Sequence, residues 1–380
     1  MKVGIMSMHR IPNYGSFMQA YSLKKMIESL DHEVCFVDYQ VEPSITKRKR
    51  PDEWIKCFIK NKKREWFNRG IIDQILHKEE KEKDIMRSCN GLLEIDENYA
   101  FHCKVDVLVI GSDEVFNCTQ AGENVGYSPE LFGKNARAKK IITYAASFGD
   151  TTYDKLQRYG VTDDLMKWVS RINNISVRDN NSKEIITSLC KKTPIINLDP
   201  VLVGNIEKLK WKKPDLEYEY IVLYGYEYRF SKEECDKILH FAKSENCKVI
   251  ALGERQFKSD IFIKCRPDEV LWYFSEAKYI ITDTFHGSIF SIINHKKFVS
   301  LIRKATPQSS GNRQKLGFLL EQLYLQERLI NSIDELSEKM HKNIDYVNVD
   351  KIREEERNKT MKYLENCIGE RWEICDEENT

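Results

Sequence analysis

Apolar runs of strand length recur along the first half of the chain, each followed by small or polar residues and a longer mixed segment. The runs are residues 2–6, 105–110, 141–146, 175–177 and 194–198. Short apolar runs that alternate with segments of helix length are typical of a parallel sheet covered by helices. The pattern therefore predicts an α/β, Rossmann-like domain over residues 1–203.

The same pattern repeats after a lysine-rich stretch at residues 204–217, which is interpreted as a linker. Strands are expected at residues 220–224, 248–252, 279–282 and 298–302, and helices at 231–245 and 268–277. Ser231 and Glu234 have the spacing of a capping box, which marks a helix start. A second Rossmann-like domain is expected over residues 218–330, followed by charged C-terminal helices over residues 331–380.

Residues 46–87 interrupt the pattern, because they contain no convincing strand and are rich in basic and aromatic residues. The basic runs at 47–50 and 60–64 are interleaved with Trp54, Phe58, Trp66 and Phe67. We interpret the segment as a helical, basic insertion in the first domain. Its aromatic residues either pack on that domain under a solvated helix face or contact a membrane surface or a lipid-linked molecule. No RNA-recognition module accompanies the basic residues, which argues against nucleic acid as a partner.

Composition changes this picture little. With 380 residues and 41% hydrophobic residues, the chain suits two domains of ordinary size. The net charge of +1 gives no case for binding nucleic acid. No run approaches the ~20 apolar residues of a membrane-spanning helix, and residues 3–8 are too short and interrupted for a signal peptide. A cytoplasmic location is expected, with the inner face of the membrane as an alternative.

The cysteines and acidic residues suggest neither disulfides nor a metal. None of the eleven cysteines forms a C-x-x-C pair, and several, such as Cys35 and Cys190, lie in or beside apolar runs. They are interpreted as reduced thiols that act as small hydrophobic residues. No cluster of His, Asp and Glu has metal-ligand spacing, so no metal site is expected.

The segment Thr282–Ser288 carries the strongest chemical signal. It follows the apolar run Tyr279–Ile281 and leaves His286 at the carboxyl end of an expected strand, where α/β proteins bind ligands. An imidazole gives and takes protons near neutrality, so His286 is a candidate general acid and base. Asp283, three residues earlier, is expected either to orient His286 or to cap the helix.

Similar turns follow the other expected strands. In order, they are Asn13-Tyr14-Gly15-Ser16 with Gln19, Gly111-Ser112-Asp113, Ser176-Val177-Arg178, Asp199-Pro200 and Phe285-His286-Gly287. This ordered set resembles the polysaccharide pyruvyltransferase family over roughly residues 1–325. The resemblance implies two Rossmann-like domains that face each other across a cleft, as in GT-B glycosyltransferases, with the last helix packing back on the first domain. It also implies transfer of the pyruvyl group of phosphoenolpyruvate onto a sugar of a bacterial surface polysaccharide or its precursor, as a ketal and without a cofactor.

Phosphoenolpyruvate carries a carboxylate and a phosphate, so its site needs several donors. Arg178 is expected to supply a two-pronged donor, and its alternative is a surface arginine paired with Asp179. Further positive charge is expected from Arg303, Lys304 and Arg313. The other expected substrate-binding residues are Asn13, Gly15, Ser16, Gly111, Ser112, Asp113, Glu114, Gly287 and Ser288. Among these, Asp113 and Glu114 are the candidates for binding sugar hydroxyls.

One departure from the family pattern concerns the donor. Well-understood members carry an Arg-Leu-His sequence, and this chain has Thr284-Phe285-His286 instead. Two alternatives therefore stand beside a pyruvyltransferase: a GT-B glycosyltransferase with a nucleotide-sugar donor, and a non-catalytic sugar-binding protein of the same fold. The partners expected for a pyruvyltransferase are phosphoenolpyruvate and a sugar acceptor, either free or lipid-linked.

Overall fold

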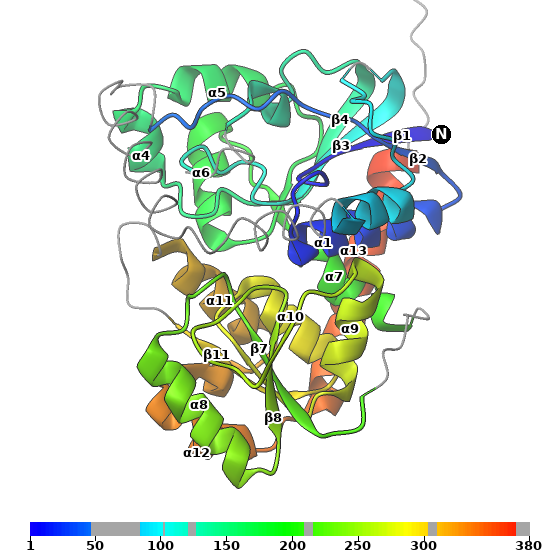
Figure 1. Cartoon of the computed structure of the whole chain (residues 1–380). Coiled ribbons are helices and arrows are strands. Elements are labelled where there is room, and N and C mark those ends of the chain that lie inside the picture. The colour runs from blue at the N-terminus through cyan, green and yellow to red at the C-terminus, as the bar shows by residue number, and fades with distance from the viewer. Residues whose placement is uncertain (47–83, 102, 121–126, 209–215, 303–309, 370–380) are drawn as a thin grey trace, which may run out of the picture.

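The computed structural model describes residues 1–46, 84–101, 103–120, 127–208, 216–302 and 310–369. These residues form two six-stranded sheets, with strand orders β2-β1-β3-β4-β5-β6 and β12-β11-β10-β7-β8-β9. All pairings within the two sheets are parallel. The predicted α/β class with two Rossmann-like units is therefore confirmed, and Figure 1 shows the two units stacked with α1, α7 and α13 at their junction.

The first unit alternates strands and helices. Its strands are β1 (Lys2–Met6), β2 (Glu33–Phe36), β3 (Val105–Asp113), β4 (Ala138–Ala146), β5 (Ser176–Val177) and β6 (Ile195–Ile196). Its helices are α1 (Tyr14–Glu28), α4 (Tyr153–Arg158), α5 (Thr162–Val169), α6 (Asn180–Cys190) and α7 (Pro200–Val203), with 3-10 turns at Pro129–Phe132 and Ile206–Lys208. Strand β3 is longer than the apolar run suggested, so Gly111, Ser112 and Asp113 belong to the strand and not to a turn.

The second unit follows the same alternation. Its strands are β7 (Tyr220–Tyr224), β8 (Lys248–Leu252), β9 (Ile261–Ile263), β10 (Tyr279–Thr282), β11 (Lys297–Leu301) and β12 (Leu329–Ile330). Its helices are α8 (Lys232–Ser244), α9 (Pro267–Glu276), α10 (Phe285–Ile293), α11 (Ser310–Gln322) and α12 (Leu336–His341), with 3-10 turns at Gln326–Arg328 and Ile333–Glu335. The predicted capping box is present, since Ser231 and Glu234 bond each other's backbone N–H groups.

A continuous apolar core joins the two units. Its fully buried members include Phe17 of α1, Leu202 of α7, Phe290 of α10 and Leu364 of the last helix, α13 (Tyr346–Gly369). Apolar side chains from both sheets pack into the same cluster, so water is excluded from the junction as well as from each sheet. The junction therefore holds the two carboxyl edges in a defined relation.

Helix α13 follows the second sheet in the chain, yet many of its bonds are made to the first unit. Arg353 Nε donates to the carbonyl of Leu202 at 3.0 Å, and Tyr363 Oη donates to the carbonyl of Thr143 at 2.8 Å. Figure 1 shows this helix, in red, running beside both units. The helix thereby ties the end of the chain to the first sheet.

Most of the predicted basic insertion, residues 47–83, lies outside the described residues, as does part of the linker, residues 209–215. Residues 84–93 are helical, and Nζ of Lys24 donates to the carbonyl of Leu93 at 3.2 Å, which ties this helix to α1. Within the described ranges, no helix combines the length and apolar character needed to span a membrane.

Candidate active site

A cavity of about 310 Å³ lies where the carboxyl ends of the two sheets face each other. The predicted site residues that line it are Asn13, Ser16, Asp113, Glu114, Arg178 and His286. They come from β1, β3, β5 and β10 or from the segments that follow these strands. Parallel strands deliver their following turns to one edge, so two facing sheets can bring residues distant in sequence into one cavity.

His286 is the second residue of α10. Thr284 caps this helix, because its Oγ1 accepts a hydrogen bond from the N–H of Gly287 at 3.0 Å. Gly287 is needed for close packing, since a Cβ atom there would overlap the Thr282 and Thr284 hydroxyls. The tight start of α10 therefore sets the direction in which the imidazole leaves the helix.

The imidazole of His286 also packs against the start of α1. Asn13 caps α1 by accepting hydrogen bonds from the N–H groups of Gly15 and Ser16 at 2.8 and 3.2 Å. A Cβ atom on Gly15 would overlap the His286 ring at Nδ1. Gly15 thus makes room for the histidine, whereas the sequence had assigned it to substrate binding. It is not among the residues that line the cavity.

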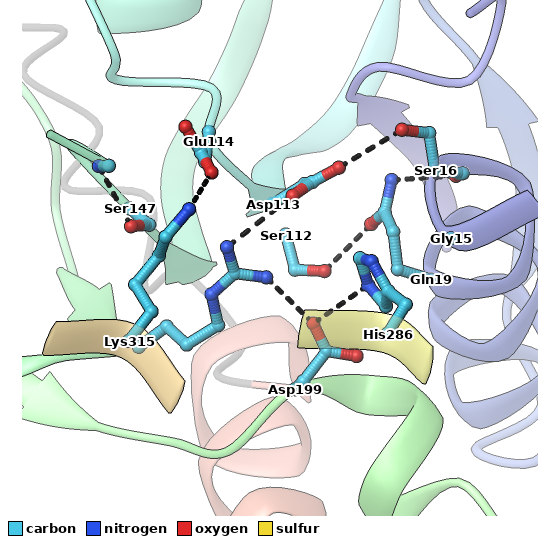
Figure 2. Close-up of polar contacts among 12 residues, drawn as sticks. Gly15, Ser16, Gln19, Ser112, Asp113, Glu114, Ser147, Asp199, His286 and Lys315 are labelled. Atoms are coloured by element: carbon cyan, nitrogen blue, oxygen red, sulfur yellow. Dashed lines mark hydrogen bonds and ion pairs between the residues drawn. The ribbon is translucent and has the colours of Figure 1, made fainter. Parts of the chain in front are cut away.

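The carboxylate nearest to His286 is that of Asp199. Nε2 of His286 lies 3.5 Å from Oδ2 of Asp199, whose side chain is fully buried (Figure 2). Burial favours the neutral form of Asp199, but the interactions with His286 and Arg178 outweigh it and hold the pKa of Asp199 below its ordinary value. Asp199 is thus held as a carboxylate beside the imidazole.

The expectation that Asp283 orients His286 is wrong. Oδ2 of Asp283 lies 2.7 Å from Nε of Arg229, and the carboxylate beside the imidazole belongs to Asp199. Three residues of separation at a strand end do not guarantee that two side chains meet, because the chain turns between them into α10. Asp199 was noticed in the sequence as part of the Asp199-Pro200 turn but was not assigned to the site.

Arg178 lies between two carboxylates. Its NH1 donates to Oδ2 of Asp199 at 2.8 Å, its NH2 to Oδ1 of Asp113 at 3.4 Å, and its guanidinium stacks on Phe285, 4.4 Å from the ring centroid. Burial would lower the pKa of Arg178, but Asp113 and Asp199 raise it above its ordinary value. The surface alternative, a pair with Asp179, is wrong, since Arg178 is 3% exposed.

Because both terminal nitrogens of Arg178 hold carboxylates, this arginine positions the acidic groups of the site. Its Nε, like Nε2 of His286, is buried without a hydrogen-bond partner among the described residues. Both residues line the cavity. Buried polar atoms without partners are rare in folded proteins and are typical of sites that bind a ligand.

Glu114 and Lys315 form an ion pair between the two units, which Figure 2 shows as Lys315 reaching from α11 to the end of β3. Nδ2 of Asn117 donates to the other carboxylate oxygen of Glu114 at 2.7 Å. Burial opposes ionisation, yet Lys315 and Arg178 lower the pKa of Glu114 to about 2. Sequence reasoning missed Lys315, because a lysine inside a helix carries no turn or strand-end signal.

Several predicted substrate-binding residues bond to other polar groups of the protein. Ser16 Oγ donates to Asp113 at 3.2 Å, and Ser112 Oγ donates to Gln19 at 2.7 Å (Figure 2). Ser288 is buried and bonds Ser300 at 2.7 Å. The expectation that Gly111, Ser112, Gly287 and Ser288 touch substrate is not met, since none of them lines the cavity.

The predicted cations downstream of His286 are only partly described. Arg303 and Lys304 lie outside the described residues, and Arg313 is described only as part of the backbone of α11. No group of three or more His, Cys, Asp and Glu side chains in the described part of the chain is arranged to hold a metal ion.

The fold and the cavity between its two sheets define a protein of the GT-B type. The UDP co-structure of S. aureus MnaA is similar to it, with 10% sequence identity, a TM-score of 0.51 and 98% of each chain covered. The UDP-GlcNAc 2-epimerase of Methanocaldococcus jannaschii, bound to UDP-GlcNAc and UDP, has 10% identity, a TM-score of 0.49 and coverage of 96% of this chain and 100% of its own. At such identity the likeness concerns the fold alone.

The chain belongs to the polysaccharide pyruvyl transferase family, whose model matches residues 13–304. The resemblance expected from the ordered turns is thereby confirmed, and the protein is a transferase. A search of curated proteins found no match.

Proposed function

We propose that the protein transfers the pyruvyl group of phosphoenolpyruvate onto two hydroxyls of one sugar as a ketal and releases phosphate. The observation that carries this proposal is the row His286–Asp199–Arg178–Asp113, in which His286, Arg178 and Asp113 line the cavity. In this row the imidazole of His286 lies beside the carboxylate of Asp199, and Arg178 joins that carboxylate to the carboxylate of Asp113. Nε of Arg178 is buried without a hydrogen-bond partner among the described residues, and the contact of His286 Nε2 with Asp199 is long, at 3.5 Å.

The reaction needs a group that moves protons. One sugar hydroxyl adds to C2 of the enol phosphate, the CH₂ carbon takes up a proton to become a methyl group, and the C2–phosphate bond breaks. The second hydroxyl adds to C2 and closes the ring. Of the two hydroxyl protons, one ends on the methyl group and the other on phosphate, so no oxidant, reductant or water is consumed.

His286 is the residue we assign to this proton transfer. As imidazolium it donates a proton to the CH₂ carbon and then accepts one from a hydroxyl. The carboxylate of Asp199, 3.5 Å from Nε2, helps to orient the ring. To Asp113, which Ser16 and Arg178 hold, we assign the role of accepting a hydrogen bond from the acceptor sugar.

The donor phosphate needs a cation, and the Arg-Leu-His arginine is absent from this chain. Lys315 is our candidate for the replacement, because it lines the cavity and has three N–H donors. Its hydrogen-bond and ion-pair partner among the described residues is Glu114. Phe285 and His286, the first two residues of α10, also line the cavity, so the start of this helix adds partial positive charge to its wall.

Two finer features of this proposal concern residues that are not described. A lipid-linked acceptor and contact with the inner face of a membrane both depend on the basic insertion, and residues 47–83 lie outside the described ranges. Both stay predictions from the sequence.

Ligand-dependent thermal unfolding tests the donor. The midpoint is measured for wild type, Lys315→Gln and the surface control Lys139→Gln, with phosphoenolpyruvate, UDP and UDP-sugars. A ligand at a hundred times its Kd stabilises the native state by about 2.7 kcal/mol. We expect phosphoenolpyruvate to stabilise wild type and Lys139→Gln and to stabilise Lys315→Gln much less. Stabilisation by a UDP-sugar and not by phosphoenolpyruvate would support the glycosyltransferase alternative instead.

A further inference from the structure

Three large aromatic side chains are exposed beside the cavity, on the loops that follow β7 and β8. Tyr226 is 52% exposed, Tyr228 45% and Phe257 46%. Tyr226 itself lines the cavity, and Tyr228 follows it by two residues in the same loop. Phe257 comes three residues after Glu254, another lining residue. The rings of Tyr228 and Phe257 lie together, with centroids 5.0 Å apart. We call these three residues the aromatic shelf.

The backbone under the shelf is held in place by hydrogen bonds. Buried Gln256 donates to the carbonyl of Tyr226 at 2.9 Å and accepts from the N–H of Phe230 at 3.1 Å. The N–H of Tyr228 donates to the carbonyl of Arg255 at 2.8 Å. The two loops are thus cross-linked to each other, which holds the backbone that carries the exposed rings. A preformed surface loses little conformational entropy on binding.

Charges of both signs surround the rings. The guanidinium of Arg229 lies 5.3 Å from the Tyr226 centroid and pairs with Asp283, and Nζ of Lys232 lies 5.7 Å from the Phe257 centroid. Glu227 is exposed in the same loop. A mixed rim of this kind does not favour an anionic membrane or nucleic acid, which would require a surface of one sign. It suits a neutral ligand that has apolar C–H faces and hydroxyl edges, which is a saccharide.

The size of the cavity supports the same occupant. About 310 Å³ is at the lower end of the range for small-molecule sites, so the donor and the reacting sugar would fill it. A saccharide longer than one residue would therefore have to leave the cavity through its mouth. Tyr226 belongs to the cavity wall, and Tyr228 and Phe257 lie in the two cross-linked loops that supply this part of the wall.

We propose that the aromatic shelf of Tyr226, Tyr228 and Phe257 is a second sugar-binding subsite, which holds the non-reacting pyranose rings of an oligosaccharide or polysaccharide acceptor by stacking. This inference rests on the proposed function, and it adds the class of acceptor: a saccharide of two or more residues. A single sugar would bind in the cavity and would not need the shelf.

The test uses the full-length protein on an array of bacterial surface saccharides that range from one to many residues. Three variants are compared with wild type. Tyr228→Ala/Phe257→Ala removes two rings, Phe257→Tyr retains a ring, and Tyr324→Ala removes a 75% exposed aromatic that does not line the cavity. We expect the double variant to lose about tenfold in apparent affinity for the longer saccharides that bind wild type. Phe257→Tyr and Tyr324→Ala should bind them like wild type.

Equal binding by wild type and the double variant would overturn the proposal, and so would binding of single sugars only. Light scattering on the same samples tests whether a second copy of the chain occupies the shelf instead of a saccharide. In that case the wild type would self-associate, the double variant would not, and glycan binding would be unchanged. The proposed function is tested separately, by measuring phosphate release from phosphoenolpyruvate in the presence of each saccharide that binds. If no phosphate is released but the double variant still loses glycan binding, the pyruvyl transfer is refuted. The shelf is then still a saccharide-binding subsite.

Discussion

Nε2 of His286 lies 3.5 Å from Oδ2 of Asp199, although the two residues belong to different units. His286 is the second residue of α10, which follows β10 of the second sheet, and Asp199 caps α7, which follows β6 of the first sheet. The acid–base group of the proposed reaction is therefore assembled only when the two units are packed against each other. This dependence makes the site sensitive to changes at the junction.

Replacing His286 by alanine is expected to lower turnover by ~10² to 10⁴, the usual contribution of a general acid or base. Binding of phosphoenolpyruvate should persist, because Lys315 and the α10 backbone remain. Phosphate release measures the first effect and ligand-induced thermal stabilisation the second. His295→Ala is the matched control, since that histidine is 48% exposed, pairs with Asp350 and does not line the cavity. Full turnover in His286→Ala would remove this residue from the mechanism.

Gly15→Ala should impair activity more than folding. The added Cβ would overlap the His286 ring, so the imidazole must move away from Asp199. A displacement of about 1 Å at a reacting group reduces the rate by roughly 10²-fold, while overpacking destabilises by about 1–3 kcal/mol. Turnover and urea unfolding are measured on the same preparation.

Gly91→Ala is the control for Gly15→Ala. Gly91 lies in the helix at residues 84–93, and a Cβ there would meet nothing within 4 Å. Alanine should leave turnover unchanged and stabilise the helix by up to ~1 kcal/mol. If Gly15→Ala and Gly91→Ala had the same turnover, the close packing of Gly15 on His286 would not contribute to activity.

The Glu114–Lys315 pair should make stability depend on pH in a defined window. The pKa of Glu114 is lowered from 4.5 to about 2, so the unfolded chain binds this proton more readily than the folded one. The stabilisation is therefore fully present above about pH 4.5 and is lost as the pH falls toward 2. Since the Glu114 side chain is 24% exposed, solvent screening reduces the effect to on the order of 2 kcal/mol.

Urea unfolding of wild type and Glu114→Gln between pH 7 and pH 3 measures this effect. The difference in unfolding free energy should be largest at pH 7 and should shrink steadily below about pH 4.5. The control is Asp84→Asn, because Asp84 forms an exposed pair with Arg87 and should show almost no such dependence. A difference that stayed constant across this range would mean that Glu114 is not held ionised by Lys315.

The central strands of both sheets were predictable, because each is buried on both faces and reads as an uninterrupted apolar run. The bounds of β7, β8 and β10 agree with the predicted ranges. Strands β2, β9 and β12 were missed. Each lies at the edge of its sheet and has two to four residues, so it buries too little surface to leave an apolar pattern.

The candidate site likewise contains residues that the sequence predicted and residues that it did not. Arg178 and His286 could be found from the sequence, because a polar residue directly after a buried strand must lie at the carboxyl edge of the sheet. The partners of these residues could not be found. Asp199 and not Asp283 meets His286, since the direction of a side chain at a helix start depends on how α10 packs on β10 and α1.

The amino-acid sequence by itself determined the two parallel sheets, their order along the chain and the family, because burial periodicity and the order of strand-end turns are local properties. The tertiary structure alone decided which residues act together. Asp199 with His286, Lys315 with Glu114, and Tyr228 with Phe257 each join segments that meet only after folding. Such pairings depend on the relative position of two packed units, which no local pattern encodes.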